Sequence, residues 1–491
     1  MARINPRLPG KRQKVYTVSV KKIKLKLFIL LLFLCLTPLF AQQYGMGAIL
    51  DPISYEQTEA KPVLLSRNYA SIPRSTTLKQ YSPIPEDQSP YGTCVGWATA
   101  FAARTISESI ALSRTNREQN SNSVFSPVFV YKGSYSVKGI NPTGKEGAVI
   151  PDVLDFMKSE GAVKRLAFEK TTDFPLILLS AFNNSQRYPI SGYVRLFSNP
   201  RGVPGTVGER VPPVKKSLAE GKPVIIGMNT PLSFHSARDV WRPWERPNIE
   251  YGGHAMCVVG YDDDIYGGAF EIQNSWGTDW GNNGYIWIRY SDFAAFVYHA
   301  YEIIENLAIY KDAARYAASI EIEVYNDTRG MPVSYDRQGF YRTSSSHPSG
   351  TEFRFMMTNR YPAYVYAFSA DSGTTGTGRI FPLRGVSPVL DYTDSTIAWP
   401  GEYDWIRLDD NAGTDYLVVL YSKEALDIGA IERRFASERG AFPERVARAV
   451  GQNFISYNEV QYNGGRMEFS TVSTNPRAVF GLLLAIDHRA R

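Results

Sequence analysis

One short stretch, residues 88–97, constrains this chain more than any other, because it predicts a loop that delivers a cysteine onto the first turn of a helix. Gly92 permits the sharp turn, and apolar residues recur at helical spacing after Cys94. A helix N-terminus carries a partial positive charge, which favours a thiolate over a thiol. The side-chain amide of Gln88 and a main-chain N–H could face the same point and form an oxyanion hole. The alternative is a small buried cysteine, which is the commoner role.

Two later stretches favour a catalytic role for Cys94 over a structural one. Residues 252–261 predict a strand, entered from a glycine turn, that carries His254. Residues 270–290 predict a strand ending at Asn274, a loop rich in tryptophan and glycine, and a further strand. A histidine can hold a thiolate as an ion pair and later protonate a leaving amine, and an asparagine amide can fix the ring. Trp276 would keep water from that contact, so this order of residues favours nucleophilic catalysis over three structural side chains.

Together the three stretches resemble papain-like cysteine peptidases, and the resemblance covers about residues 83–308. Its most specific part is the run Asn-Ser-Trp-Gly-x-x-Trp-Gly-x-x-Gly-Tyr. The resemblance implies peptide-bond hydrolysis through a thioester, without a cofactor. It implies these roles: Cys94 as nucleophile, His254 as acid and base, Asn274 as its orienting partner, Gln88 with the Cys94 N–H as oxyanion hole, Trp276 as the shield of the triad, and Gly147 as a contact for the substrate backbone.

Three features depart from the family pattern. The family motif around the nucleophile begins with another cysteine, whereas residues 91–95 read Tyr-Gly-Thr-Cys-Val. The histidine and asparagine lie farther from the cysteine than the usual window of about 130–150 residues, which indicates an insertion within 181–213 or 229–251. Only Gly147 remains of a glycine pair found in relatives, because Ala148 follows it. These departures favour a bacterial branch of the fold and leave the substrate preference open.

Residues 1–41 predict a secretory signal. Nine Lys and Arg residues and no acidic residue accompany an apolar run at 27–36, which suits a signal core and is too short to anchor the chain in a bilayer. Cleavage is expected after Ala41, so Cys35 would leave with the signal, and an uncleaved anchor is the alternative. We therefore expect an exported protein of the periplasm, cell surface or medium, with no stable membrane span after signal removal.

The basic character of the chain comes from this same segment. The whole chain has 54 Lys and Arg against 48 Asp and Glu, but without the signal the acidic residues are in excess. The charge therefore gives no reason to expect nucleic acid, and the expected partner is a protein or peptide substrate. The two remaining cysteines are too few for a disulfide framework, and Cys257 is expected in the core. No metal-ligand spacing occurs, so no metal site is predicted.

Residues 42–82 contain Pro52, Pro62 and Pro73, which are expected to break regular structure. This segment is shorter than a papain-type inhibitory pro-region. We interpret it as a linker plus a strand that packs on the peptidase domain, with a short activation peptide as the alternative. Within the peptidase domain the expected elements are a helix from Cys94 to near Ser113, a loop over 116–123, helical segments over 125–131, 147–161 and 211–221, a strand over 223–227 and a surface histidine, His235.

The early helices and late strands predict an α+β, two-lobed peptidase domain with a cleft between the lobes. Residues 309–491 predict a separate β-rich, sandwich-like domain. Its expected elements are strands over 320–325, 352–357, 363–369, 378–382, 416–421, 466–472 and 478–486, a turn at 371–373, and helices over 423–439 and 443–451. Residues 350–422 loosely resemble a domain of unknown function appended to bacterial peptidases and kinases, which names no partner.

The sequence leaves three functions to distinguish. The first is a secreted cysteine endopeptidase. The second is a catalytically silent, peptidase-like binding or adhesion protein, and the third is a related acyl-transfer enzyme, such as a transpeptidase or deamidase. None of the three proposed catalytic positions is broken, which favours an enzyme.

Overall fold

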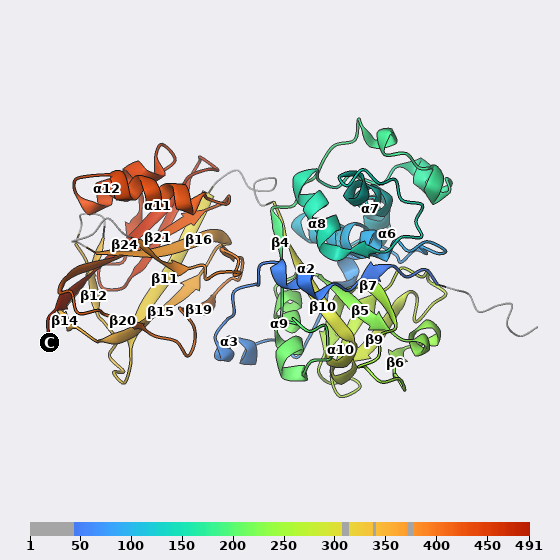
Figure 1. Ribbon diagram of the computed structural model, residues 1–491, viewed down its shortest axis with the longest axis horizontal. Coiled ribbons are helices and arrows are strands. Elements are labelled where there is room, and N and C mark those ends of the chain that lie inside the picture. Colours follow the sequence, from blue (N-terminus) through green and yellow to red (C-terminus); the bar gives the residue numbers. More distant parts are fainter. Residues whose placement is uncertain (1–43, 307–313, 337–339, 372–376) are drawn as a thin grey trace, which may run out of the picture. The chain divides into compact units, whose positions relative to one another are not determined.

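The computed structural model describes residues 44–306, 314–336, 340–371 and 377–491. The last described strand of the expected peptidase domain, β10, ends at Ile304, and β11, the first described strand of the expected C-terminal domain, begins at Ala314 (Figure 1). The predicted signal, 1–41, lies outside the described residues, as does the predicted turn at 371–373 beyond its first residue. Among the described helices none has the length and apolar character needed to cross a membrane.

Short helices form the first half of the peptidase domain. The predicted helix after the cysteine loop is present as α4 (Cys94–Gly96), eight π-helical residues (Trp97–Arg104) and α5 (Thr105–Ala111). Almost every side chain of the π-helical part is buried, including the large side chains of Phe101 and Arg104. Figure 1 shows three further helices gathered in this half of the domain: α6 (Arg117–Asn122), α7 (Pro127–Ser136) and α8 (Ile150–Ser159).

A mixed sheet forms the second half of the peptidase domain. Its strand order is β4 (Gly192–Arg195), β10 (Val297–Ile304), β5 (Val224–Thr230), β7 (Gly252–Asp262), β8 (Ala269–Gln273), β9 (Tyr285–Arg289) and β6 (Val240–Trp241). Strand β2 (Ser75–Thr77) pairs with β7, as expected for a packing strand from the N-terminal segment. Helices α9 (Val207–Ala219) and α10 (Tyr290–Phe296) pack beside the sheet.

Three predictions for this domain were wrong in detail, each at a helix start. The loop expected at 116–123 contains α6, because the Asn116 side chain accepts hydrogen bonds from the N–H groups at its first turn. Helix α9 starts before residue 211, since Thr206 and Glu209 form a capping box. Pro52 begins helix α2 (Pro52–Gln57) instead of breaking structure, because proline is well suited to a first helical position. Helix α3 (Ser66–Ala70) follows.

The C-terminal domain contains two sheets, as its alternating strands predict. One has the order β19 (Ser395–Trp399), β15 (Glu352–Asn359), β11 (Ala314–Val324), β23 (Glu468–Ser473) and β22 (Gln461–Tyr462), with β20 (Ile406–Arg407) on β15. The other has the order β12 (Val333–Tyr335), β13 (Tyr341–Thr343), β24 (Phe480–Arg489), β21 (Gly413–Ser422), β16 (Ala363–Asp371) and β17 (Thr377–Phe381), with β14 (His347–Pro348) and β18 (Val389–Leu390) alongside. Apolar side chains from both sheets form one buried cluster, so the domain is sandwich-like.

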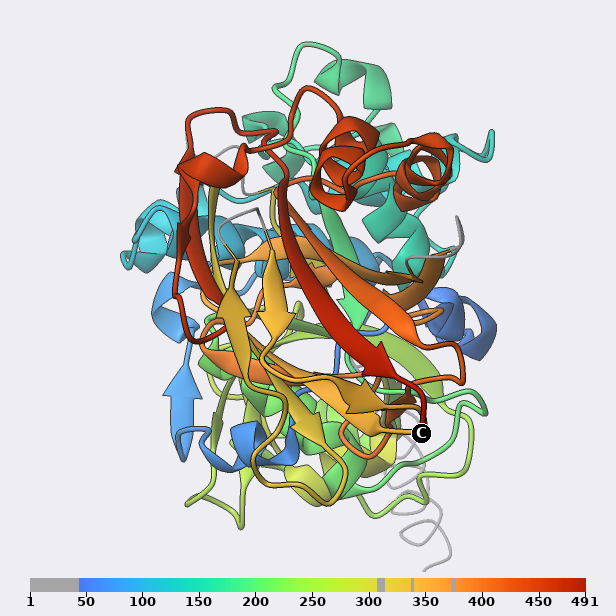
Figure 2. The same ribbon diagram turned by 90° about the vertical axis from the view of Figure 1, so that its left-hand side faces the viewer.

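Helices α11 (Ile428–Ser437) and α12 (Phe442–Val450) lie side by side (Figure 2). They share a second apolar cluster with the sheet that contains β24, β21 and β16. The helix predicted over 423–439 is shorter than expected, because the Asp427 side chain caps it and it begins at Ile428.

Candidate active site

Cys94 is the first residue of α4, and its side chain is completely buried. Its sulfur accepts a hydrogen bond from the Ala255 N–H at 3.4 Å. Ala255 is the residue after His254 on β7. This contact therefore brings the first two sequence stretches together, from the helical half and the sheet half of the domain.

His254 and Asn274 are in direct contact. The histidine Nε2 lies 2.7 Å from the asparagine Oδ1, and the Trp276 ring stacks on the imidazole with ring centres 4.6 Å apart. The Nδ1 of His254 is buried and has no hydrogen-bond partner among the described residues. Burial lowers the pKa of His254 to about 4, so the ring is neutral in this state. One ring nitrogen is thus fixed and the other is available for proton transfer.

Gln88 is buried, and its side-chain amide is held at both ends. Its Nε2 donates to the Tyr91 carbonyl oxygen at 2.8 Å, and its Oε1 accepts from the Ser275 hydroxyl at 2.6 Å. The sequence did not single out Ser275, although it lies between Asn274 and Trp276 in the most specific motif. The position of Ser275 within that motif was the sequence signal that could have identified it.

His235 is not the surface residue that the sequence predicts. It is half-buried, and its ring lies 5.0 Å from the Trp276 ring. A positive charge on His235 would lower the pKa of His254. No local pattern marks His235, because a long excursion of the chain between β5 and β7 brings it to Trp276.

Gly147 and Ala148 both use main-chain atoms in hydrogen bonds within the domain. The Gly147 carbonyl accepts a hydrogen bond from the Tyr135 hydroxyl. The Ala148 N–H instead donates to the carbonyl oxygen of Gly47 at 2.7 Å. The contact of Gly147 with a substrate backbone, which the family resemblance implies, stays a prediction.

Residues 45–50, which we call the covering segment, lie over Cys94 and Trp276. Its strand β1 (Ala48–Ile49) pairs in parallel with β3 (Ala148–Val149). Trp276 Nε1 donates to the Gly45 carbonyl at 2.9 Å. Burial raises the pKa of the Cys94 thiol to about 11, and hydrogen bonds from main-chain N–H groups, including those of Gly47 and Ala48, oppose this rise only in part. The sequence did not foresee this contact with the cysteine.

Comparison with known proteins identifies the class to which this fold and these residues belong. Residues 86–302 match the family described as papain family cysteine protease. This part of the chain is therefore a papain-like cysteine protease domain, and the C-terminal β-rich domain lies beyond the match.

Individual relatives are distant. An uncharacterized peptidase C1-like protein of Acanthamoeba polyphaga mimivirus is 34% identical over 90 residues, which are 17% of this chain and 28% of the viral protein. The chain thus matches less than a third of that relative. Among solved structures, xylellain, a cysteine protease from Xylella fastidiosa, is 23% identical with a TM-score of 0.41, covering 54% of this chain and 97% of its own. Digestive procathepsin L 3 of Tenebrio molitor larval midgut is 15% identical with a TM-score of 0.39, covering 59% and 94%.

Proposed function

We propose that the chain is an exported cysteine endopeptidase that hydrolyses peptide bonds with Cys94, His254 and Asn274. One observation carries this proposal. The histidine is fixed to the asparagine through Nε2, its Nδ1 is buried and unpaired among the described residues, and the adjacent residue on β7 contacts the cysteine sulfur. These contacts support the proposal, because a thiol nucleophile needs a nearby proton acceptor that a third group orients.

The residues divide the chemistry as follows. The sulfur of Cys94 attacks the peptide carbonyl carbon after its proton passes to His254 Nδ1, and a C–S bond forms. The imidazolium then protonates the amine nitrogen, the C–N bond breaks and a thioester remains. Water attacks the thioester with the imidazole as base, which releases a carboxylic acid and restores the thiol. Asn274 holds the ring orientation throughout, and Trp276 covers that contact.

Gln88 is proposed to stabilise the negative oxygen of each tetrahedral intermediate together with the Cys94 N–H. For this role its Nε2 must keep one orientation. The Tyr91 carbonyl oxygen sets that orientation, because it can only accept, and the Ser275 hydroxyl reinforces it by donating to Oε1.

Replacing Ser275 with alanine is therefore expected to lower kcat about tenfold with little change in KM, a smaller loss than the roughly 10²–10³ typical for loss of an oxyanion donor itself. Steady-state kinetics on a peptide amide test this prediction, and the Gln88→Ala variant gives the upper limit of the loss in kcat. Ser82→Ala is the matched control, because Ser82 is also buried but bonds to Lys79 and Tyr285. Equal losses from both serine variants would contradict the positioning role.

Product analysis tests the proposed reaction against its two alternatives. The covering segment hides the sulfur, and a side chain at Gly47 would displace it, because a Cβ there would lie 2.1 Å from the Gly92 carbonyl oxygen. The full chain and its Gly47→Leu variant are therefore both incubated with an unfolded protein. Hydrolysis predicts new internal cleavages with free carboxylates, each carrying one oxygen from labelled water, detected by mass spectrometry. A transpeptidase would join the acyl group to an added amine, a deamidase would leave the backbone intact, and a binding protein would change nothing. Any of these three results would overturn the proposal.

Export is the second part of the proposal. It rests on the basic and apolar pattern of residues 1–41, which suits secretion to the periplasm, cell surface or medium. Amino-terminal sequencing of protein recovered outside the cytoplasm should begin at Gln42, and an intact residue 1 would contradict cleavage.

A further inference from the structure

We propose that residues 231–251, which we call the β5–β7 connection, form a recognition surface for the half of the peptide substrate that leaves as the amine. Leu232 and Trp244 contact a large apolar side chain of that half. Arg242 and Arg246 attract a carboxylate beside it. This inference rests on the proposed function and adds the substrate class of the same site. The spacing of the catalytic residues predicted an insertion in this stretch, so the family pattern does not account for it.

The β5–β7 connection leaves the sheet at the end where His254 lies. Strand β5 ends at Thr230, whose partner on β7 is two positions before His254. Farther along the connection, the ring centres of Phe234 and His235 lie 5.7 and 5.0 Å from that of Trp276. The Trp276 ring in turn stacks on His254. The connection is therefore joined to the imidazole side of the site.

The proposed chemistry decides which half of a substrate passes this side. The acyl half becomes bonded to the Cys94 sulfur, whereas the amine half receives its proton from His254. The amine half therefore departs from the imidazole side, along the β5–β7 connection. Side chains on that connection can select the residues that follow the scissile bond.

Hydrogen bonds to one carboxylate hold the two apolar residues close together. The Glu245 carboxylate accepts from the Ser233 N–H at 2.8 Å, from the Ser233 hydroxyl at 2.6 Å and from the Trp244 N–H at 3.2 Å. The Ser233 hydroxyl also accepts from Nε1 of the buried Trp241 at 3.0 Å. Because Leu232 directly precedes Ser233, these bonds hold the main chain of Leu232 near that of Trp244. The surface is thus formed before any substrate binds.

Leu232 and Trp244 are exposed in spite of this support. Each has 75% of its surface exposed, whereas Trp241 in the same connection is 1% exposed. Large apolar side chains that are exposed together, and not singly, are characteristic of binding surfaces. Tryptophan is also the residue type that contributes most often to binding energy, because it offers a large rigid area. The exposed pair therefore suits a large apolar side chain of the substrate.

Arg242 and Arg246 give the surface its charge preference. Both are exposed, and neither has an ion-pair partner among the described residues. Glu245 lies between them in the sequence, so two guanidinium groups face one carboxylate and the run is positive. Asp239 and Glu250, the other acidic residues of the connection, lie farther away along the chain. An unpaired guanidinium can bind a substrate carboxylate in a charge-assisted hydrogen bond.

A library of mixed peptides tests this preference. The Gly47→Leu chain is incubated with the library, and mass spectrometry identifies the residues on both sides of each cleaved bond. We expect aromatic and large aliphatic residues, with Asp or Glu beside them, to be enriched about tenfold over Gly and Lys after the cleaved bond.

Substitutions on the surface should change the profile on one side of the bond only. Leu232→Ser and Trp244→Ser should each reduce the apolar enrichment to about twofold or less, and Trp244→Tyr should retain most of it. Arg242→Gln together with Arg246→Gln should remove only the acidic enrichment. The residues preferred before the cleaved bond should not change in any of these variants. Tyr403→Ser is the control for an exposed aromatic residue elsewhere, since Tyr403 is 82% exposed, and it should leave the whole profile unchanged.

Binding can be measured apart from turnover in the Gly47→Leu chain that also carries Cys94→Ala. The probe is the peptide Ala-Phe-Asp amide, whose free amine makes it a mimic of the leaving half. It should bind about tenfold more tightly than Ala-Gly-Asn amide in a ligand-observed NMR titration. Trp244→Ser should remove most of this difference.

The possible results separate this inference from the proposed function. Hydrolysis with a preference that the two serine variants lose supports both the surface and the peptidase. Hydrolysis without the preference, or with a preference that the serine variants keep, overturns the surface and leaves the peptidase. Selective binding of the probe without any hydrolysis supports the surface and refutes the peptidase. The absence of both overturns both.

Discussion

Replacing Cys94 with alanine should reduce peptide hydrolysis to background, with a loss in kcat of at least about 10⁴-fold. The reason is chemical, because alanine has no atom that can form the thioester. The variant is best made together with Gly47→Leu, so that the covering segment does not mask the comparison. Hydrolysis of a fluorogenic peptide amide measures the loss, and mass spectrometry should find no labelling by a thiol-directed epoxide at residue 94.

His254→Ala should cause a loss of similar size, and the double variant should be no slower than the slower single variant, because the two groups act as one unit. The pH dependence of alkylation distinguishes this role from a structural one. Without the imidazolium, Cys94 in the Gly47→Leu chain should react slowly at pH 7 and regain its rate only as pH approaches the ordinary thiol pKa of about 8.5.

Cys257→Ala is the control for both variants. Cys257 is buried, and burial raises the pKa of its thiol well above the usual range, so it is a poor nucleophile. Its removal should leave kcat unchanged. Persistent hydrolysis in the Cys94→Ala chain would refute the assignment of the nucleophile and require another one.

The sequence predicted the positions of Cys94, His254 and Asn274 within the fold because each follows a local rule. The cysteine begins a helix after a glycine turn, His254 lies on β7, and Asn274 directly follows β8, two strands whose apolar residues continue into the core. The β-rich character of the C-terminal domain was equally accessible, since its strands alternate and its sheets share one apolar core. These features depend on residues that are close in sequence.

The covering segment could not be predicted in the same way. Its pairing with residues 148–149 and its contact with Trp276 join positions that are far apart in sequence. Two glycines in a short stretch indicate a turn as readily as close backbone packing. His235 was misjudged for the same reason, because only the tertiary fold places it against Trp276. Long-range partners, and not local propensity, decide these cases.

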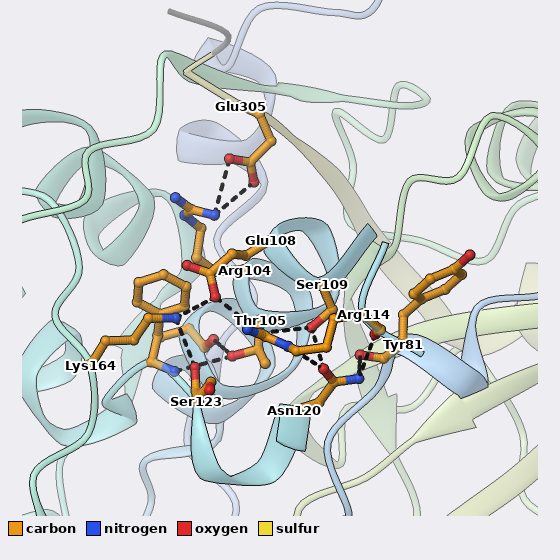
Figure 3. Close-up of polar contacts among 12 residues, drawn as sticks. Tyr81, Arg104, Thr105, Glu108, Ser109, Arg114, Asn120, Ser123, Lys164 and Glu305 are labelled. Atoms are coloured by element: carbon orange, nitrogen blue, oxygen red, sulfur yellow. Dashed lines mark hydrogen bonds and ion pairs between the residues drawn. The ribbon is translucent and has the colours of Figure 1, made fainter. Parts of the chain in front are cut away.

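Replacing Arg104 with methionine should lower the free energy of unfolding by about 3–5 kcal/mol at pH 7, as expected when one partner of a buried ion pair is removed. Arg104 lies in the π-helical stretch after Cys94, and its side chain is fully buried. Its Nη1 is 3.1 Å from the carboxylate of Glu305, which is itself only 18% exposed (Figure 3). Methionine preserves most of the volume of the arginine side chain. The loss of stability therefore reflects the Glu305 carboxylate that is left without its ion-pair partner.

The size of this loss should depend on pH. Burial raises the pKa of Glu305, while Arg104 and Lys164 oppose the rise and Glu108 adds to it. Removing the arginine raises this pKa further, so the folded variant holds a proton that the unfolded chain has already released. The retained proton on Glu305 favours the folded variant. Its contribution to stability is complete below the unfolded pKa of about 4.3 and is lost as pH rises through the folded pKa. The destabilisation should therefore be smaller at pH 5 than at pH 7.

Urea unfolding followed by tryptophan fluorescence at both pH values measures the two losses, in the Cys94→Ala background to prevent self-digestion. Arg74→Met is the matched control, because Arg74 pairs with Asp264 at the surface, with 72% and 64% of their side chains exposed. Because solvent screens a surface pair, this variant should lose far less stability than Arg104→Met, and the loss should not differ between the two pH values. An Arg104→Met loss that is equally small, or unchanged between pH 5 and 7, would mean that Glu305 finds water or another cation when the arginine is gone.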